Sequence, residues 1–181
     1  MRELALNILD IVENSVKAKA KLVTIKVTAL KNVLTILITD DGCGMSEEFV
    51  ARVTDPFTTT RTTRKVGMGI PLFKMAAEMA GGKFEIKSKI DVGTTVEAEF
   101  EIDNIDRAPL GNIAETMTTL LSDEIATEFL LEVDIDGKKF EFDTRELKEA
   151  LGGVSISEPQ VLLLVRDMIK ENLTEIGGER L

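Results

Sequence analysis

Strand-like segments follow one another in this chain with very little sequence between them. Three pairs of runs rich in β-branched and other apolar residues are separated by at most four residues: 22–30 with 33–39, 83–89 with 94–102, and 127–134 with 138–143. A parallel connection needs about a dozen residues or more, so each pair is expected to form an antiparallel hairpin. Asp136-Gly137 is a strong hairpin signal in itself. The sequence therefore predicts a mainly antiparallel sheet.

Helical patterns lie before, between and after these hairpins. Apolar residues recur on one side of an amphipathic helix over 2–18. Further helices are expected at 46–55, 70–80, 110–122, 144–151 and 158–173. The segment 104–109 reads as a boundary. We therefore expect an α+β protein with one domain over 1–104 and a small α+β domain of unknown role over 105–181.

Composition removes several classes of function. The 181 residues include no histidine, which excludes an imidazole base, a histidine metal ligand and a phosphohistidine in this chain. The net charge of −10 argues against a nucleic-acid partner, because a duplex-binding surface is basic. No apolar run is long enough to span a membrane and no signal-peptide pattern is present, so we expect a cytoplasmic protein without a membrane partner.

The first predicted helix carries a polar stripe. Its members lie within an arc of roughly 80° and are Glu3, Asn7, Asp10, Asn14 and Lys17. A solvent-exposed face would have the same pattern. Alternatively, Asp10 and Asn14 face a shared ligand, since a carboxylate can accept a proton from water and an amide oxygen suits Mg²⁺.

A glycine-containing turn follows the second strand, with the sequence DDGCGM from Asp40 to Met45. Gly42 and Gly44 would let the backbone approach a flat ligand, and Asp40 could accept a hydrogen bond from an exocyclic amine. An ordinary turn fits the same residues. A calcium loop does not, because the oxygen ligands that should follow at fixed spacing are missing.

A polar segment over 57–69 leads directly into a helix. It combines several threonines with three basic residues, Arg61, Arg64 and Lys65, and with Gly67 and Gly69. Cations, glycines and the amides of a helix N-terminus together form an anion site. A flexible linker would have a similar composition, and no Walker loop is present.

Four motifs in a fixed order resemble the GHKL superfamily, which includes gyrase B, the large heat-shock chaperone, histidine kinases and MutL. They are DIVENSVKA at 10–18, DDGCGM at 40–45, VGMGIPL at 66–72 and GTTV at 93–96. The resemblance covers residues 1–104. It implies a two-layer sandwich of the Bergerat type, with helices covering one face of a mainly antiparallel mixed sheet, followed by the small α+β segment.

The resemblance also implies roles for individual residues around Mg²⁺ and ATP. Asn14 would hold Mg²⁺, and Asp10 occupies the place of a glutamate that activates water in MutL and gyrase, although its side chain is one methylene shorter. The base would lie against Asp40, Gly42, Gly44 and Met45, with Thr94 acting through water. The phosphates would meet Gly67, Gly69 and the cations Arg61, Arg64 and Lys65.

Three activities fit this resemblance. The first is a slow ATPase that changes shape with nucleotide. The second is a kinase that acts in trans on a partner's histidine, or on serine as in the anti-sigma group. Autophosphorylation in cis is excluded because the chain has no histidine. The third is an interaction module that binds ATP without chemistry. All three imply ATP as a ligand, and the second requires a protein partner.

Overall fold

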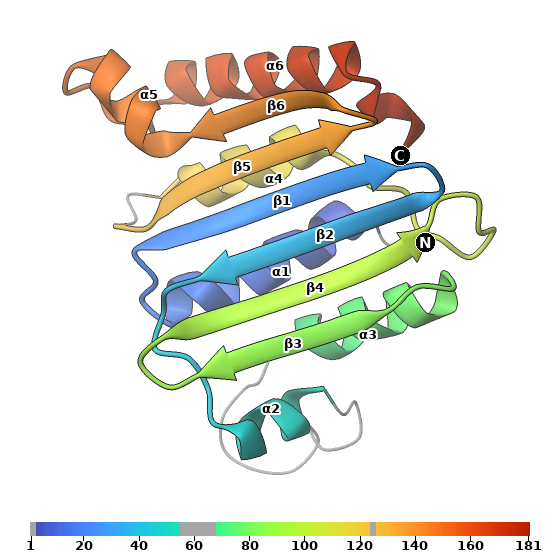
Figure 1. Ribbon diagram of the computed structural model, residues 1–181. Coiled ribbons are helices and arrows are strands. Elements are labelled where there is room, and N and C mark those ends of the chain that lie inside the picture. Colours follow the sequence, from blue (N-terminus) through green and yellow to red (C-terminus); the bar gives the residue numbers. More distant parts are fainter. Residues whose placement is uncertain (1–2, 55–67, 124–125) are drawn as a thin grey trace.

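The computed structural model describes residues 3–54, 68–123 and 126–181. Within these ranges, six strands form one sheet in the order β3-β4-β2-β1-β5-β6 (Figure 1). Their bounds are β1 Leu22–Leu30, β2 Val33–Asp40, β3 Phe84–Lys89, β4 Gly93–Glu101, β5 Glu128–Ile135 and β6 Lys138–Asp143. The three predicted hairpins are present as β1/β2, β3/β4 and β5/β6, all antiparallel.

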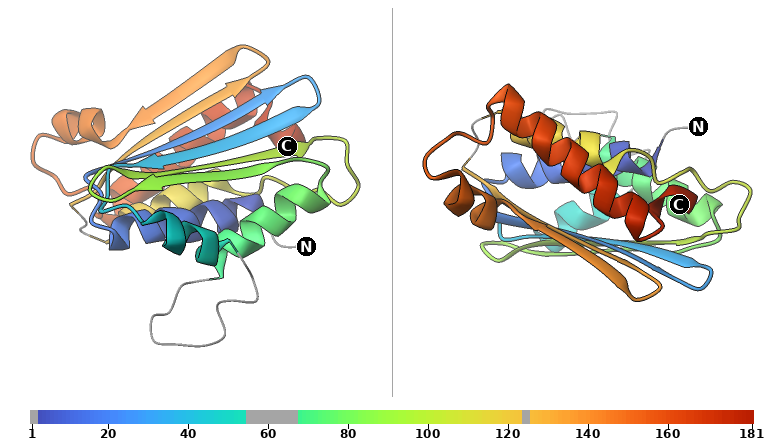
Figure 2. Two further views of the ribbon diagram at one scale, coloured as in Figure 1. Left: turned by 60° about the horizontal axis from the view of Figure 1, so that its bottom comes forward. Right: turned by 90° about the horizontal axis from the view of Figure 1, so that it is seen from above.

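Helices cover one face of this sheet and leave the other open (Figure 2). They are α1 Leu4–Lys17, α2 Glu47–Val53, α3 Gly69–Met79, α4 Ile113–Leu121, α5 Thr144–Leu151 and α6 Pro159–Glu175, with a 3₁₀ turn η2 at Gly178–Arg180. The predicted α+β class, with a mainly antiparallel mixed sheet and helices on one face, is confirmed.

The covered face is built by strict alternation along the strands. In β1, Val23, Ile25, Val27 and Ala29 are buried, while the residues between them are half-buried or exposed. The same alternation runs through β2 and β5, and through β4 from Val96 onward. Since successive side chains of a strand point to opposite faces, every second residue along these stretches packs against the helices.

One pairing in the sheet is parallel. β5 lies beside β1 over its whole length, with Val23 opposite Phe129 and Val27 opposite Val133. The chain reaches β5 from β4 through α4, and this crossover is long enough for a parallel connection. β5 and β6, which lie beyond residue 104, thus extend the same sheet on the β1 side. The division into two domains after residue 104 stays a prediction.

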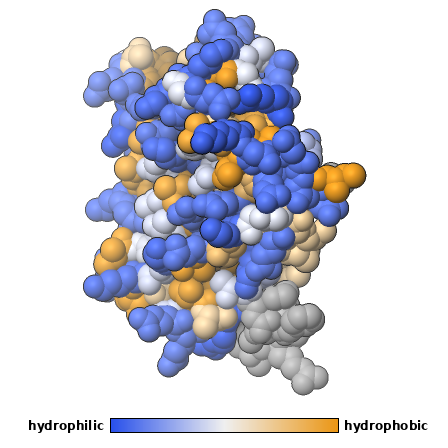
Figure 3. Space-filling view, turned by 45° about the vertical axis from the view of Figure 1, so that its right-hand side comes forward, coloured by the Kyte–Doolittle hydropathy of each residue, from blue (hydrophilic) through white to orange (hydrophobic). Residues whose placement is uncertain are grey.

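The face of the molecule drawn in Figure 3 carries many hydrophilic side chains. On the face in Figure 3, apolar residues form small separate groups among charged and polar ones. None of the helices in the described parts of the chain is long and apolar enough to cross a membrane.

Candidate functional site

Asp40 is the last residue of β2 and lies on the covered face of the sheet. Leu34, Ile36 and Ile38 precede it at every second position and are buried under the helices, so the period of the strand turns the Asp40 side chain the same way. Thr94 of β4 is its partner on one side, and Ser88 of β3 is the partner of Thr94. Three polar side chains therefore form a row at one end of an otherwise apolar layer.

The Asp40 carboxylate is held in place from two directions. Ser15 of α1 is buried and donates from Oγ to Asp40 Oδ2 at 2.6 Å. The backbone N–H of Gly42 donates to Oδ1 at 2.9 Å. The residue is only 9% exposed. Both oxygens keep further lone pairs, so a fixed and poorly hydrated acceptor lies at the end of the strand.

The turn after β2 is anchored to its surroundings by its backbone and by Asp41. Asp41 Oδ1 accepts from the N–H groups of Lys21 at 2.7 Å and Leu22 at 3.0 Å, so this carboxylate fixes the start of β1. The hydrogen bond from Leu22 is the main cause that lowers the pKa of Asp41. The N–H of Cys43 donates to the Ala18 carbonyl at 3.0 Å.

The glycines of the motifs lie where side chains would collide with backbone. Gly44 has a φ of +64°, and a Cβ there would lie 1.9 Å from the Lys89 carbonyl oxygen. At Gly93, a Cβ would lie 1.9 Å from the Asp40 carbonyl oxygen. The turn after β2 and the β3–β4 link can pack this closely only because glycine occupies both positions.

A second hydrogen-bonded group connects β3, β4 and the turn. Ser88 Oγ lies 2.8 Å from Thr94 Oγ1 and 3.0 Å from the carbonyl oxygen of Gly93. It also accepts from the N–H of Met45 at 2.8 Å. The Met45 side chain is half-buried and packs against the apolar core. The sequence had placed Met45 and Thr94 in one site, and the structure brings them together through Ser88.

The first and third motifs meet beside α1. A Cβ added at Gly69, the first residue of α3, would lie 2.8 Å from Asp10 Cβ. The N-terminus of α3 is therefore in contact with Asp10, and glycine is the residue that permits this approach. Asn14 lies one turn further along α1 and is half-buried. The remaining predicted phosphate-binding residues, Arg61, Arg64, Lys65 and Gly67, lie outside the described residues.

Asn14 carries an amide oxygen, which is a type of ligand that Mg²⁺ accepts. This ion usually keeps several waters and takes one or two protein ligands together with substrate phosphates. Among the described residues, no group of three or more cysteine or acidic side chains is arranged to hold a metal ion alone.

Ser15 and Ser88 were not identified from the sequence. Both positions carried a usable signal. Ser88 has the same strand phase as Phe84 and Ile86, which places it on the covered face at the level of Thr94. Ser15 follows Asn14 and has the phase of Ile8 and Ile11 on the buried side of α1. A hydroxyl in a row of apolar positions needs a buried hydrogen-bond partner.

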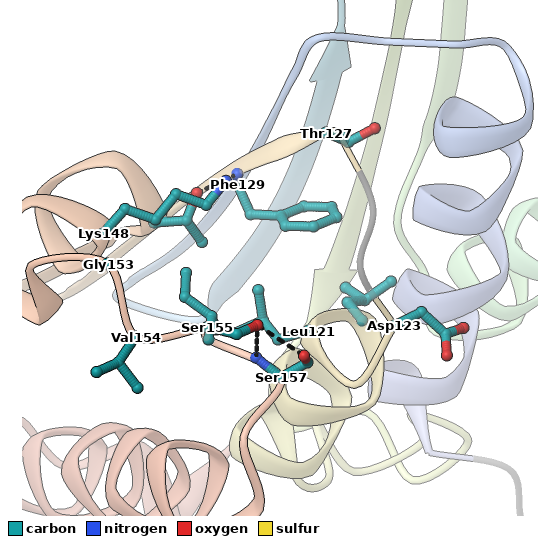
Figure 4. Close-up of a pocket in the computed structure, with 12 residues that line it drawn as sticks. Leu121, Asp123, Thr127, Phe129, Lys148, Gly153, Val154, Ser155 and Ser157 are labelled. Carbon is teal, nitrogen blue, oxygen red and sulfur yellow. Dashed lines mark hydrogen bonds between the residues drawn. The ribbon is translucent and has the colours of Figure 1, made fainter.

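Another hollow, of about 310 Å³, lies between α4, β5, α5 and the segment 153–157 (Figure 4). Apolar and polar side chains line it together, and several of the polar ones already have partners. Thr144 Oγ1 and Lys148 Nζ each lie 2.5 Å from a carboxylate oxygen of Glu128. The hydroxyls of Ser155 and Ser157 are 2.8 Å apart. None of the four motifs contributes to this hollow, so we do not include it in the candidate site.

The sequence of the Asp40 site matches a known family. The family model described as "Histidine kinase-, DNA gyrase B-, and HSP90-like ATPase" matches residues 2–104, more than half of the chain. The chain belongs to this family. The predicted GHKL resemblance is thereby confirmed, and all four motifs fall within the matched region of this ATPase domain.

Curated relatives of this GHKL chain include sensor kinases. The chain is 29% identical over 101 residues to histidine protein kinase DivJ of Caulobacter vibrioides, covering 52% of this chain and 17% of DivJ. It is 33% identical over 64 residues to the C4-dicarboxylate transport sensor protein DctB of Pseudomonas aeruginosa, covering 35% of this chain and 10% of DctB. The chain thus spans less than a fifth of the length of these relatives.

Solved structures support the fold of this GHKL chain. The Aquifex aeolicus MutL ATPase domain complexed with ADP has a TM-score of 0.52 and 18% identity, covering 81% of this chain and 66% of that domain. The N-terminal domain of a DNA repair protein has a TM-score of 0.53 and 15% identity, covering 78% and 52% respectively. At such identities the likeness concerns the fold alone.

Proposed function

We propose that this GHKL chain binds Mg²⁺-ATP and either hydrolyses it or transfers its phosphoryl group to a partner protein. The observation that carries the proposal is the Asp40 carboxylate. It is nearly buried, its two oxygens are oriented by Ser15 and Gly42, and Thr94 lies beside it. Such an acceptor suits the exocyclic amine of adenine, and an ionised carboxylate would repel a carbonyl group in the same place.

The phosphate end of the nucleotide would lie toward Asp10 and Gly69. α3 begins at Gly69 without a side-chain cap from Met68, and the helix dipole favours negative charge at this helix end. Asn14 would hold Mg²⁺ against the phosphates. In this proposal the cations Arg61, Arg64 and Lys65 add charge to the same region. The metal would neutralise phosphate charge, while Asp10 would orient or deprotonate the attacking group.

The acceptor of the phosphoryl group is either water or a residue of another protein. This chain has no histidine of its own to phosphorylate, although its relative DivJ is named a histidine protein kinase. A partner histidine or serine would therefore be reached in trans. An interaction module that binds ATP without chemistry is the alternative, and the position of Asp10 against the α3 N-terminus favours chemistry over that alternative.

An Asp10→Asn variant tests this proposal. If Asp10 activates the attacking group, its removal lowers turnover by about 100- to 10,000-fold while ATP affinity changes far less. We would measure affinity by calorimetry, and hydrolysis and label transfer with γ-labelled ATP, with and without candidate partners. Glu13→Gln is the matched control, because Glu13 is an exposed carboxylate of the same helix that pairs with Lys17.

The possible results distinguish the proposed activities from one another. Hydrolysis lost in Asp10→Asn but kept in Glu13→Gln supports Asp10 as the base for water. Hydrolysis at the wild-type rate in Asp10→Asn removes Asp10 from that role. Label transfer only with a partner present identifies a kinase acting in trans. ATP binding with neither hydrolysis nor transfer identifies an interaction module, and failure of the wild-type protein to bind ATP refutes the proposal.

A further inference from the structure

We propose that Ser88, on the edge strand β3, is a positioning residue that makes the Thr94 hydroxyl a hydrogen-bond acceptor in the base-binding site. The inference rests on the proposed function, because it concerns how the same site selects its base. Ser88 lies outside the four motifs, and it acts on the base through Thr94.

The hydrogen-bond partners of Ser88 determine which of the two hydroxyls, Ser88 or Thr94, donates to the other. The Ser88 hydroxyl has one proton to give and two lone pairs to fill. The proton goes to the Gly93 carbonyl at 3.0 Å, and one lone pair accepts the N–H of Met45 at 2.8 Å. The remaining lone pair faces Thr94 Oγ1 at 2.8 Å, so Thr94 must be the donor in that pair. Every hydrogen-bonding position of Ser88 is then used.

The consequence falls on Thr94. Its single proton is committed to Ser88, so toward the ligand it presents only lone pairs. Thr94 is the cross-strand partner of Asp40, whose carboxylate is also an acceptor. Two neighbouring acceptors select for a ligand edge that brings donors, either directly or through a water. A purine amine provides such donors, whereas a carbonyl group provides none.

Loss of the Ser88 hydroxyl would undo this arrangement. In Ser88→Ala, the proton of Thr94 is released and can point toward the ligand, where it opposes the amine. The N–H of Met45 also loses its acceptor. Because Ser88 is only half-buried, water can replace part of what is lost. A neutral hydrogen bond is worth roughly a 3- to 10-fold change in affinity, and we expect a loss of ATP affinity in that range.

The test compares ATP with purine riboside triphosphate, which carries hydrogen in place of the amine. Ser88→Ala should weaken ATP roughly 3- to 10-fold and the analogue less, so that discrimination between the two falls. Ser88→Thr keeps a hydroxyl on a strand residue, so its affinities for ATP and for the analogue should both stay near those of the wild type. Lys87→Ala is the matched control, because its exposed side chain lies on the opposite face of β3 and pairs with Glu85.

A double-mutant cycle with Thr94→Val separates positioning from a structural role. If Ser88 acts through Thr94, Ser88→Ala has no further effect on ATP affinity in the Thr94→Val background. Thermal unfolding of each variant reports the integrity of the fold. Ser88→Cys replaces the alanine variant if the latter unfolds, because it keeps the volume but is a weak donor and acceptor.

Three results would overturn the inference. They are unchanged ATP affinity in Ser88→Ala, an equal loss for ATP and the analogue, and additive effects of the two substitutions. Failure of the wild-type protein to bind ATP would refute the proposed function itself. A wild-type protein that binds ATP beside a Ser88→Ala variant of equal affinity would refute this inference alone.

Discussion

Replacing Asp40 by asparagine should weaken ATP binding sharply and leave the fold intact. The carboxylate accepts from the N–H of Gly42 and from the Ser15 hydroxyl. In the variant, the amide oxygen can stay opposite Gly42, so the NH₂ group takes the place of Oδ2. The Ser15 hydroxyl can then accept from that group and keep its own contact with the Ile11 carbonyl at 3.5 Å. The Gly42 N–H and the Ser15 hydroxyl therefore both keep acceptors, so the unfolding free energy should change little.

The expected loss of ATP affinity follows from the group that the adenine amine would meet at residue 40 in the variant. A charged acceptor, poorly screened at 9% exposure, is replaced by a group that presents donors of its own. Hydrogen bonds to charged groups contribute about 1.5–3 kcal/mol, which corresponds to roughly a 10- to 100-fold loss of affinity. Calorimetry of ATP binding measures this loss directly.

Asp41→Asn is the matched control for Asp40→Asn. It makes the same change of charge at the neighbouring residue, but Asp41 accepts only backbone N–H groups at the start of β1 in the described structure. An amide oxygen can keep those bonds. Affinity should therefore fall in Asp40→Asn and stay near the wild-type value in Asp41→Asn. Equal affinities for wild type and Asp40→Asn would refute the placement of the base. Equal losses in both variants would instead indicate a general charge effect.

Two more predictions concern the metal and pH. Asn14→Ala should remove most of the ATP affinity and most of its dependence on Mg²⁺. Calorimetry of ATP binding in Mg²⁺ and in EDTA tests this. Wild-type binding that is equally tight in EDTA would contradict the assignment. Hydrogen bonding, chiefly from Leu22, lowers the pKa of Asp41 below its ordinary value of 3.8, so ionised Asp41 stabilises the fold above that pH and the contribution is lost as pH falls through the lowered pKa. Urea unfolding of wild type and Asp41→Asn should therefore show a difference at pH 7 that shrinks by pH 3, and a constant difference would contradict the assignment.

Much of the fold could be predicted because the signals that specify it are local. Hairpin links of at most four residues leave only antiparallel pairing, and β1/β2, β3/β4 and β5/β6 form accordingly. The position of Asp40 follows from the same local rule. Once Leu34, Ile36 and Ile38 point toward the helices, the period of two carries Asp40 onto the covered face.

Contacts between distant segments could not be read from these local rules. The parallel pairing of β5 with β1 depends on how α4 packs behind the sheet, and no spacing in the sequence encodes that choice. The two serines show the same limit at the level of side chains. The motifs predicted residues that would face a ligand, but Ser15 and Ser88 have their partners only because a helix lies over Asp40 and an edge strand lies beside Thr94. A hydroxyl that the strand or helix period places on a buried face must donate its proton to some acceptor. Where no neighbour in the sequence can accept it, the acceptor comes from another element of the tertiary structure.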